Sequence, residues 1–167
     1  MNAPRPWAPA SAFRQSVRYF PLPSVSAAIQ NEAGEILYVM RKNNPAKGLW
    51  WLPGGRILNG ETVADALARV LRDETGLDGE VVAVSPEYSE ELWRTEGFDA
   101  EDWQRYEPDT EFIHYLGISA YVKVEGTPTI ILDDQSSQVL WSKTLPHEHP
   151  LLVAYFDALA RMGHELR

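Results

Sequence analysis

The 167-residue chain contains no cysteine, so disulfides, thiolate nucleophiles and cysteine-bound zinc sites are excluded. Long hydrophobic runs are also lacking, because nowhere do about 18 apolar residues follow one another. The first residues show no basic segment followed by an apolar stretch, so nothing in them indicates a secretory leader. From these absences we expect a cytoplasmic protein that has no membrane partner.

Positive charge is scarce. The chain has 15 Lys and Arg against 24 Asp and Glu, and its formal net charge at pH 7 is −9. Such an excess of acid argues against broad binding to nucleic acid or to an anionic membrane. It would also repel a phosphate ligand at long range. Anion binding would therefore require local arginines and a divalent cation.

A glycine turn that leads into an amphipathic helix lies near the middle of the chain, between Gly54 and Leu77. Thr62 and Asp65 have the spacing of a capping box, which marks the start of a helix. Gly76 is suited to a left-handed cap at the other end. Apolar residues between these caps recur at intervals of three and four and so predict one buried stripe, made of Val63, Ala66, Leu67, Val70 and Leu71.

Glu74 interrupts this pattern. At about 100° per residue it falls within the apolar stripe, beside Val70 and Leu71. A carboxylate there would be desolvated, which is costly unless it is paired or binds a metal ion. Either the last turn frays and Glu74 swings into solvent, or its carboxylate holds a cation. Because Asp73, Arg69, Glu61 and the glycine turn could all lie within reach, we favour the cation site.

The rest of the chain predicts one mixed α/β (α+β) domain over residues 21–167, preceded by an arm or short helix over residues 1–20. Alternation predicts strands at 25–30, 35–41, 81–84, 112–124 and 139–141, and a short strand or extended run at 129–132. Helices are expected over 11–19 and from Pro150 to Met162. Residues 86–111, rich in acids and aromatics, are expected to form a long loop, either a solvated flap or a lid over a ligand.

The spacing Gly55-x5-Glu61-x7-Arg69-x-Leu71-x-Asp73-Glu74-x-Gly76-Leu77 resembles the Nudix box, G-x5-E-x7-R-E-U-x-E-E-x-G-U, in which U is bulky and aliphatic. One position departs from the pattern, because Val70 stands where that family usually has a glutamate. The resemblance implies a mixed β-sheet sandwiched between helices. It also implies a divalent cation at the box helix and hydrolysis of a nucleoside diphosphate that is linked to a further group.

Residues 41–56 read Arg-x-Asn-x-Pro-Ala-x-Gly-x-Trp-x-x-Pro-Gly-Gly-Arg, which looks like the GDP-mannose mannosyl hydrolase branch of the family. Tyr115, which follows a histidine, and Gln135, six residues before Trp141, are similar to that branch as well. The branch also tolerates an apolar residue at the Val70 position. The resemblance therefore implies a nucleotide sugar as the small-molecule substrate, and a homodimer in which the N-terminal region can dock on a second subunit.

Site residues follow from the same resemblance. It implies Mg²⁺ or Mn²⁺ on hard oxygen ligands, and these are the Gly54 carbonyl, the Glu74 carboxylate, the Gln135 amide oxygen and, as in the wider family, Asp73. The residues that it implies as catalytic are Arg56, Glu61, Arg69 and Tyr115. Those that it implies as substrate-binding are Arg41, Arg56, Tyr115 and Trp50. Guanidinium groups suit this role because they bind phosphate oxygens through paired, charge-assisted hydrogen bonds.

Two of these assignments have a structural alternative. Arg69 can bind phosphate, or it can hold Glu61 or Glu74 in place. The adjacent tryptophans Trp50 and Trp51 can flank a planar base, or they can be ordinary packing residues.

Three departures separate the chain from the mannosyl hydrolases. Ser136 stands where they have a histidine base, Ser26 stands where they have an acid, and the loop over residues 86–111 is longer. Without the histidine, attack at phosphorus becomes more plausible than attack at the sugar carbon. The base that activates water stays open between Asp133, Asp134 and an acid of the long loop such as Glu107 or Glu111, and a metal ion can also lower the pKa of its bound water. The same losses motivate a second hypothesis, a nucleotide-binding or regulatory module with little or no turnover.

Overall fold

The computed structural model describes residues 9–163 of the chain. In chain order, the helices and strands of this range are α1 (Ala10–Tyr19), β1 (Leu22–Gln30), β2 (Ile36–Arg41), β3 (Trp50–Trp51), β4 (Gly54–Arg56), α2 (Val63–Val70), the π-helical turn η1 (Leu71–Thr75), β5 (Glu80–Arg94), the 3₁₀ turn η2 (Asp102–Gln104), β6 (Phe112–Lys123), β7 (Ser136–Ser142) and α3 (Pro150–Arg161). This mixed α+β architecture confirms the predicted fold class. Within the described range, no helix has the length and apolarity needed to cross a membrane.

The sheet divides at β1. Along its main path the strand order is β3-β2-β1-β6-β5, with β7 paired to β2 and β4 paired to β1. β1 runs parallel to β6 over its whole length. On its other side, Gln30 at the end of β1 pairs with β2, whereas residues 24–26 pair with β4. The sheet therefore opens into a fork between β2 and β4.

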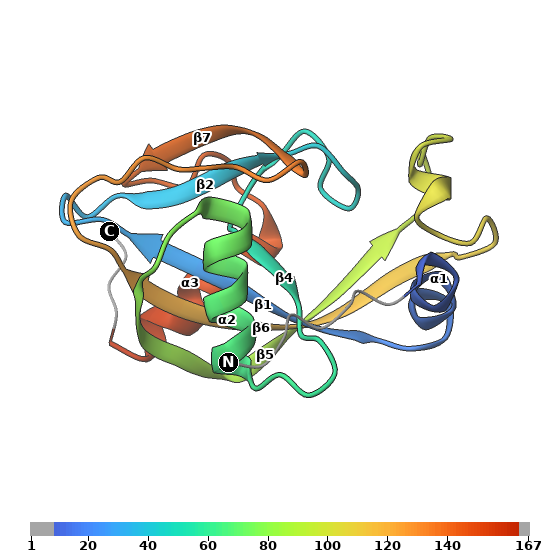
Figure 1. The fold of residues 1–167 in the computed structure, drawn as a ribbon, viewed down its shortest axis with the longest axis horizontal. Coiled ribbons are helices and arrows are strands. Elements are labelled where there is room, and N and C mark those ends of the chain that lie inside the picture. The colour runs from blue at the N-terminus through green and yellow to red at the C-terminus, as the bar shows by residue number, and fades with distance from the viewer. Residues whose placement is uncertain (1–8, 164–167) are drawn as a thin grey trace.

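Helices cover both faces of the sheet, with α2 in front of it and α3 behind it in the view of Figure 1. Leu67 and Val70 of α2 are fully buried against Ile29 and neighbouring residues of the sheet. On the opposite face, Leu152 and Leu159 of α3 pack into a second apolar cluster. The predicted sandwich of a sheet between helices is confirmed.

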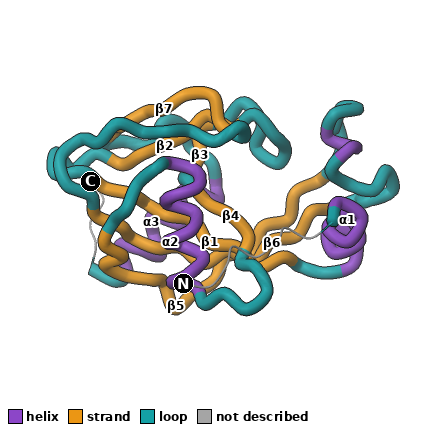
Figure 2. The backbone as a smooth tube through the Cα atoms, viewed as in Figure 1, coloured by secondary structure: helices purple, strands orange, loops and turns teal. Residues whose placement is uncertain are grey.

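A projecting arm extends from this body. It consists of α1, the start of β1, the outer halves of β5 and β6, and the loop over residues 95–111 (Figures 1 and 2). Its helix lies over Ala10–Tyr19, close to the predicted 11–19, whereas residues 1–8 of the predicted N-terminal arm lie outside the described residues. The arm has an apolar cluster of its own, formed by Val17, Leu22, Tyr106 and Ile113.

The structure corrects one local prediction and decides between the two alternatives of another. Residues 86–94 are not loop, because β5 continues through them and pairs with β6 as far as Arg94 opposite Phe112. Residues 129–132 form no strand, and there the Ile131 N–H donates to the Thr75 carbonyl at 2.9 Å. The loop prediction for residues 95–111 agrees with the structure apart from the short turn η2.

Candidate active site

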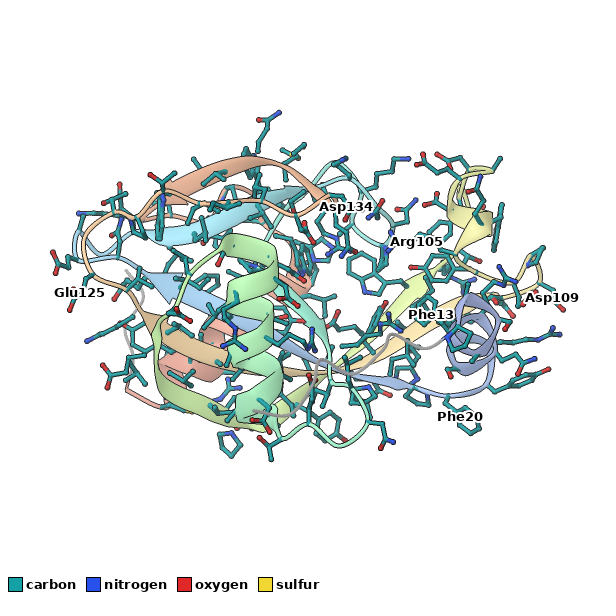
Figure 3. All side chains as sticks on the ribbon, in the orientation of Figure 1. Phe13, Phe20, Arg105, Asp109, Glu125 and Asp134 are labelled. Atoms are coloured by element: carbon teal, nitrogen blue, oxygen red, sulfur yellow. The ribbon has the colours of Figure 1, made fainter. Side chains whose placement is uncertain are left out.

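A cavity of about 470 Å³ lies at the fork of the sheet, between the body and the arm. Its floor comes from β1 and β4. One wall comes from the box helix, which consists of α2 and η1, at its C-terminal end. Loop residues 44–46, together with Asp133, Gln135 and Ser136 at the start of β7, form another wall. Phe13, Arg105 and Tyr106 of the arm close the remaining side, and Figure 3 shows Phe13 on the side of α1 that faces the body.

Most of the predicted site residues lie around this cavity. Those that line it are Arg41, Gly54, Arg56, Arg69, Asp73, Glu74, Tyr115 and Gln135. Glu61 and Trp50 do not line it. Successive residues of a strand face opposite ways, so Trp51, rather than Trp50, reaches the cavity wall. Trp50 instead packs at the edge of the apolar cluster beneath α3.

Glu74 does not swing into solvent. The helix widens into the π-helical turn η1, which ends at Gly76 in the left-handed conformation with φ of 70°. Glu74 Oε2 accepts a hydrogen bond from the Gly54 N–H at 3.0 Å, so the carboxylate closes onto the glycine turn. Burial raises the pKa of Glu74 to about 7, and the charge of Asp133 acts in the same direction. A cation at this point would therefore be favoured electrostatically.

Arg69 and Glu61 form a clamp. Arg69 Nε and one terminal nitrogen donate to the two carboxylate oxygens of Glu61 at 2.7 and 3.0 Å. The same terminal nitrogen donates to the Arg56 carbonyl at 2.7 Å, and Glu61 also accepts from the Leu58 N–H at 2.8 Å. The hydrogen bond from Arg69 lowers the pKa of Glu61. Two roles were open to Arg69, and these contacts favour the structural one. Arg69 ties the glycine loop to the helix through Glu61.

Two arginines and a tyrosine face the cavity from the sheet. Arg41 is fixed by its Nε, which donates to the Pro45 carbonyl at 2.8 Å. The Arg56 guanidinium lies over the Phe13 ring, 3.9 Å from the ring centroid, and burial lowers its pKa. Burial raises the pKa of Tyr115, so its hydroxyl remains a hydrogen-bond donor at neutral pH.

The residues present fit a divalent cation held by mixed oxygen donors. Glu74, Asp73, Asp133 and Gln135 line the same cavity, and the Gly54 backbone adjoins Glu74. Among the described residues, no group of three or more His, Cys, Asp or Glu side chains is arranged to hold a metal ion. Amide and carbonyl oxygens and water would therefore have to complete the shell, as is usual for Mg²⁺.

Sequence reasoning missed several cavity residues. Arg105 donates to Gln135 Oε1 at 3.2 Å, and the Tyr106 hydroxyl donates to the Asn44 carbonyl at 3.0 Å. Both belong to the loop for which the sequence predicts a flap or a lid. Glu91 also lines the cavity, although the sequence placed it among the acids of a polar loop. Only the pairing of β5 with β6 brings Glu91 to this wall, and no local pattern marks that pairing.

The comparisons with known proteins agree with this geometry. The family profile described as NUDIX domain matches residues 21–154. The Low-salt glycan biosynthesis protein Agl8 of Haloferax volcanii is 33% identical over 143 residues, which cover 83% of this chain and 82% of that protein. The ADP-ribose pyrophosphatase of Methanocaldococcus jannaschii is 42% identical over 69 residues, which cover 41% of this chain and 40% of that protein.

The crystal structure of the MutT protein from Methanosarcina mazei Go1 has a similar fold. Its TM-score is 0.58 at 22% identity, over 87% of this chain and 97% of that one. The profile match over most of the chain, together with the long alignment to a relative that is one-third identical, leads to one conclusion. This chain belongs to the Nudix family and is a hydrolase of nucleoside diphosphate derivatives.

Proposed function

We propose that this Nudix hydrolase cleaves a nucleotide sugar with the help of Mg²⁺ or Mn²⁺, by attack of water at phosphorus. One observation carries the proposal: Glu74, three predicted arginines and Tyr115 converge on one cavity of about 470 Å³. A cavity of that size suits a nucleotide derivative. The name of the Haloferax volcanii relative, which refers to glycan biosynthesis, supports a sugar as the group linked to the diphosphate.

In this proposal the metal ion is held by Glu74, Asp73, Gln135 and the Gly54 carbonyl. When bound, a divalent cation neutralises charge on the diphosphate and lowers the pKa of a bound water. Arg41 and Arg56 bind phosphate oxygens from the sheet, which offsets the net charge of −9 that would repel the substrate. The two arginines attract the phosphates at short range, whereas the net negative charge of the protein repels them at long range.

Tyr115 donates a hydrogen bond to a phosphate oxygen or to the departing group. Glu61 acts through Arg69 and does not touch the substrate, because it lies outside the cavity lining and is bound by that guanidinium. Its role in the proposal is to keep the glycine loop, and with it Gly54, in position.

Asp133 is the base that we propose. Of the four acids named above, Asp133 is the one in the cavity lining. Glu91, a further acid of the predicted long loop, also lines the cavity but is bound by Tyr155 and Trp93. The Asp133 carboxylate accepts from the Gln135 N–H at 3.0 Å and from the Gln135 amide group at 3.1 Å, which fixes its orientation. Glu107 is instead bonded to Arg14, and Glu111 is paired with Arg94.

A homodimer remains a prediction. Tyr19 and Phe20, where α1 ends, are 64% and 66% exposed. Figure 3 shows Phe20 at the lower edge of the arm, pointing out from it. An interface formed through the arm would remove these aromatic side chains from water.

The test is a turnover assay with GDP-mannose, UDP-glucose and ADP-ribose in the presence of Mg²⁺ or Mn²⁺. We expect hydrolysis of at least one, and a loss in Glu74→Gln of roughly a hundredfold or more in kcat, the scale of one lost electrostatic contact in a transition state. Glu32→Gln, a change at an exposed acid in a turn, is the matched control. No product from any substrate, combined with ligand-dependent thermal stabilisation, would favour the binding module instead.

The bond that breaks can be assigned separately. Hydrolysis in ¹⁸O-labelled water should place the label on a phosphate product, as read by mass spectrometry. Label on the sugar would contradict attack at phosphorus while leaving the hydrolase assignment intact.

A further inference from the structure

Glu91 is a buried acid in the cavity wall to which the proposed reaction gives no role. It lies on β5, opposite Tyr115 of β6, and is 6% exposed. Its Oε1 accepts a hydrogen bond from the Tyr155 hydroxyl of α3. Its Oε2 accepts from Trp93 Nε1 at 3.4 Å, and Ser89 contributes a further side-chain hydrogen bond. The carboxyl group is therefore fixed from two elements.

The carboxyl group is not neutralised by a cation of the protein. The ion pairs among the described residues do not include Glu91. Burial raises its pKa, and the more distant charge of Arg41 only partly opposes that rise. A carboxylate can accept about four hydrogen bonds, so the three contacts from the protein leave capacity for a donor from the cavity.

The position of this carboxyl separates it from the hydrolytic centre. It lies over Gly117 of β6, where a Cβ atom would come within 2.5 Å of Oε1. Gly117 pairs with Ser24 of β1, which in turn pairs with Arg56 of β4. Adjacent strands are about 4.8 Å apart, so two spacings put Glu91 about 10 Å from β4, the strand whose Gly54 binds Glu74. Tyr115 lies between this carboxyl group and β4, so Glu91 faces the end of the proposed diphosphate site that is farthest from Glu74.

Aromatic side chains surround this end of the cavity. Trp51 and Trp93 line it together with Glu91. The Trp93 ring is held by stacking on His149, with the ring centroids 5.4 Å apart and the planes 19° from parallel. Rigid aromatic walls beside a fixed acceptor suit a ring that has apolar faces and hydroxyl groups at its edge.

We propose that Glu91, held by Tyr155, accepts hydrogen bonds from hydroxyl groups of the sugar attached to the diphosphate. The inference rests on the proposed function, since the sugar follows the diphosphate that the arginines, Glu74 and Tyr115 hold, and Tyr115 lies opposite Glu91. Glu91 is in this view a specificity-determining residue, because a ligand without the sugar hydroxyls leaves its carboxyl group unsatisfied. Such a penalty discriminates between ligands more strongly than apolar contact does.

Calorimetric binding with Ca²⁺ in place of Mg²⁺, under conditions in which the wild type releases no product, tests this with GDP-mannose against GDP, UDP-glucose against UDP, and ADP-ribose against ADP. In the wild type, we expect the sugar to tighten binding for at least one pair. In Glu91→Gln, we expect the Kd of that nucleotide sugar to rise roughly tenfold to a hundredfold, the scale of a hydrogen bond to a charged group. The Kd of the parent diphosphate should stay within about twofold.

Glu90→Gln is the matched control, because Glu90 is the neighbouring acid and its 60% exposed side chain lies by His114. It should change neither Kd. If Glu91→Gln fails to fold, Tyr155→Phe, which removes the donor to Glu91, should show the same selective loss in smaller measure.

The failures are distinguishable. Equal weakening of both members of the pair, or no weakening of either, would overturn the role of Glu91 and leave the proposed function standing. Equal wild-type affinity for sugar and parent in all three pairs would do the same. If the wild type binds none of the six ligands, the proposed function itself fails, and this inference with it.

Discussion

At the scale of single residues, the Arg69–Glu61 clamp shows how one ion pair holds a loop in a shape suited to catalysis. Their side chains are only 18% and 14% exposed, so solvent screens the pair little. The clamp also takes in the Arg56 carbonyl and the Leu58 N–H, which lie on either side of the bend after β4. Loss of the clamp should therefore loosen the loop that carries Gly54.

We predict that Glu61→Gln lowers the free energy of unfolding by about 2 kcal/mol at pH 7, the scale of a charge-assisted hydrogen bond. Arg69 holds the folded-state pKa of Glu61 below its ordinary value of 4.5. Its stabilisation is therefore present above pH 4.5 and is lost as the pH falls through the lowered pKa. Urea unfolding should show wild type and variant converging in acid.

The surface pair Arg161–Glu87 provides the comparison for that measurement. Both side chains are more than half exposed, so Glu87→Gln should change the unfolding free energy by less than about 0.5 kcal/mol. A difference between wild type and Glu61→Gln that persists undiminished at pH 3 would show that the ionised carboxylate is not the source of the stability.

The sequence predicts for some residues, but not for others, whether the side chain faces the cavity. Helical periodicity alone indicates that Glu74 faces inward, and the structure places it there. The faces of a two-residue strand cannot be read from two adjacent tryptophans, so the sequence could not indicate that Trp51, rather than Trp50, lines the cavity. Glu91 and Arg105 could not be found at all, because their partners, Tyr155 and Gln135, are distant in the sequence.

At the scale of elements, the box helix is the part that local rules specify best. Thr62 and Asp65 form the predicted capping box, with Thr62 Oγ1 accepting from the Asp65 N–H at 3.2 Å and Asp65 Oδ2 accepting from the Thr62 N–H at 3.1 Å. The helix is short, so its start matters for the position of Glu74 at its end.

Thr62→Ala should lower the free energy of unfolding by about 1 kcal/mol, as expected for loss of an N-cap side chain. For a chain of this size that corresponds to a fall in Tm of roughly 2–4 °C. Thr62→Ser keeps the hydroxyl and should remain close to the wild type. If serine and alanine destabilise equally in a thermal melt, the cap is not what stabilises this end.

β5 was the element hardest to predict, for a physical reason. Its outer half is a largely exposed strand of the arm, so acids occupy positions that a buried strand would fill with apolar residues. Pro86 adds a turn signal, yet it lies where the β5–β6 register shifts between Val84 and Tyr88, a place at which a strand tolerates proline. Hydrogen bonding to β6 overrides the local composition.

At the scale of the whole molecule, polar contacts between arm and body close the cavity. Asn44 of the body donates to Asp102 of the arm at 2.8 Å, and the Tyr106 hydroxyl reaches the Asn44 carbonyl. Lys47 and Asp99 add an exposed ion pair at 2.9 Å. These contacts bridge loops that the sequence keeps far apart.

We predict that Asn44→Ala speeds amide hydrogen exchange in residues 95–106, because the loop loses a tie to the body. KM for the substrate should rise about fivefold, the equivalent of about 1 kcal/mol for one hydrogen bond. Tm should barely change, since the apolar clusters are untouched. Asn43→Ala, at the neighbouring asparagine that takes no part in these bonds, is the control. Unaltered exchange and KM would mean that the arm is held by other contacts.

The two sides of the cavity differ in how readily their sequence can be changed, because one side is a paired strand and the other is a loop of the arm. The floor that carries Gly54 is a paired strand, and changing it disturbs the sheet. The arm contributes its cavity residues from a loop that packs on its own cluster. Replacing residues 95–111, with Arg105 kept for its bond to Gln135, would therefore reshape the ligand side of the cavity while the paired strand that carries Gly54 stays in place.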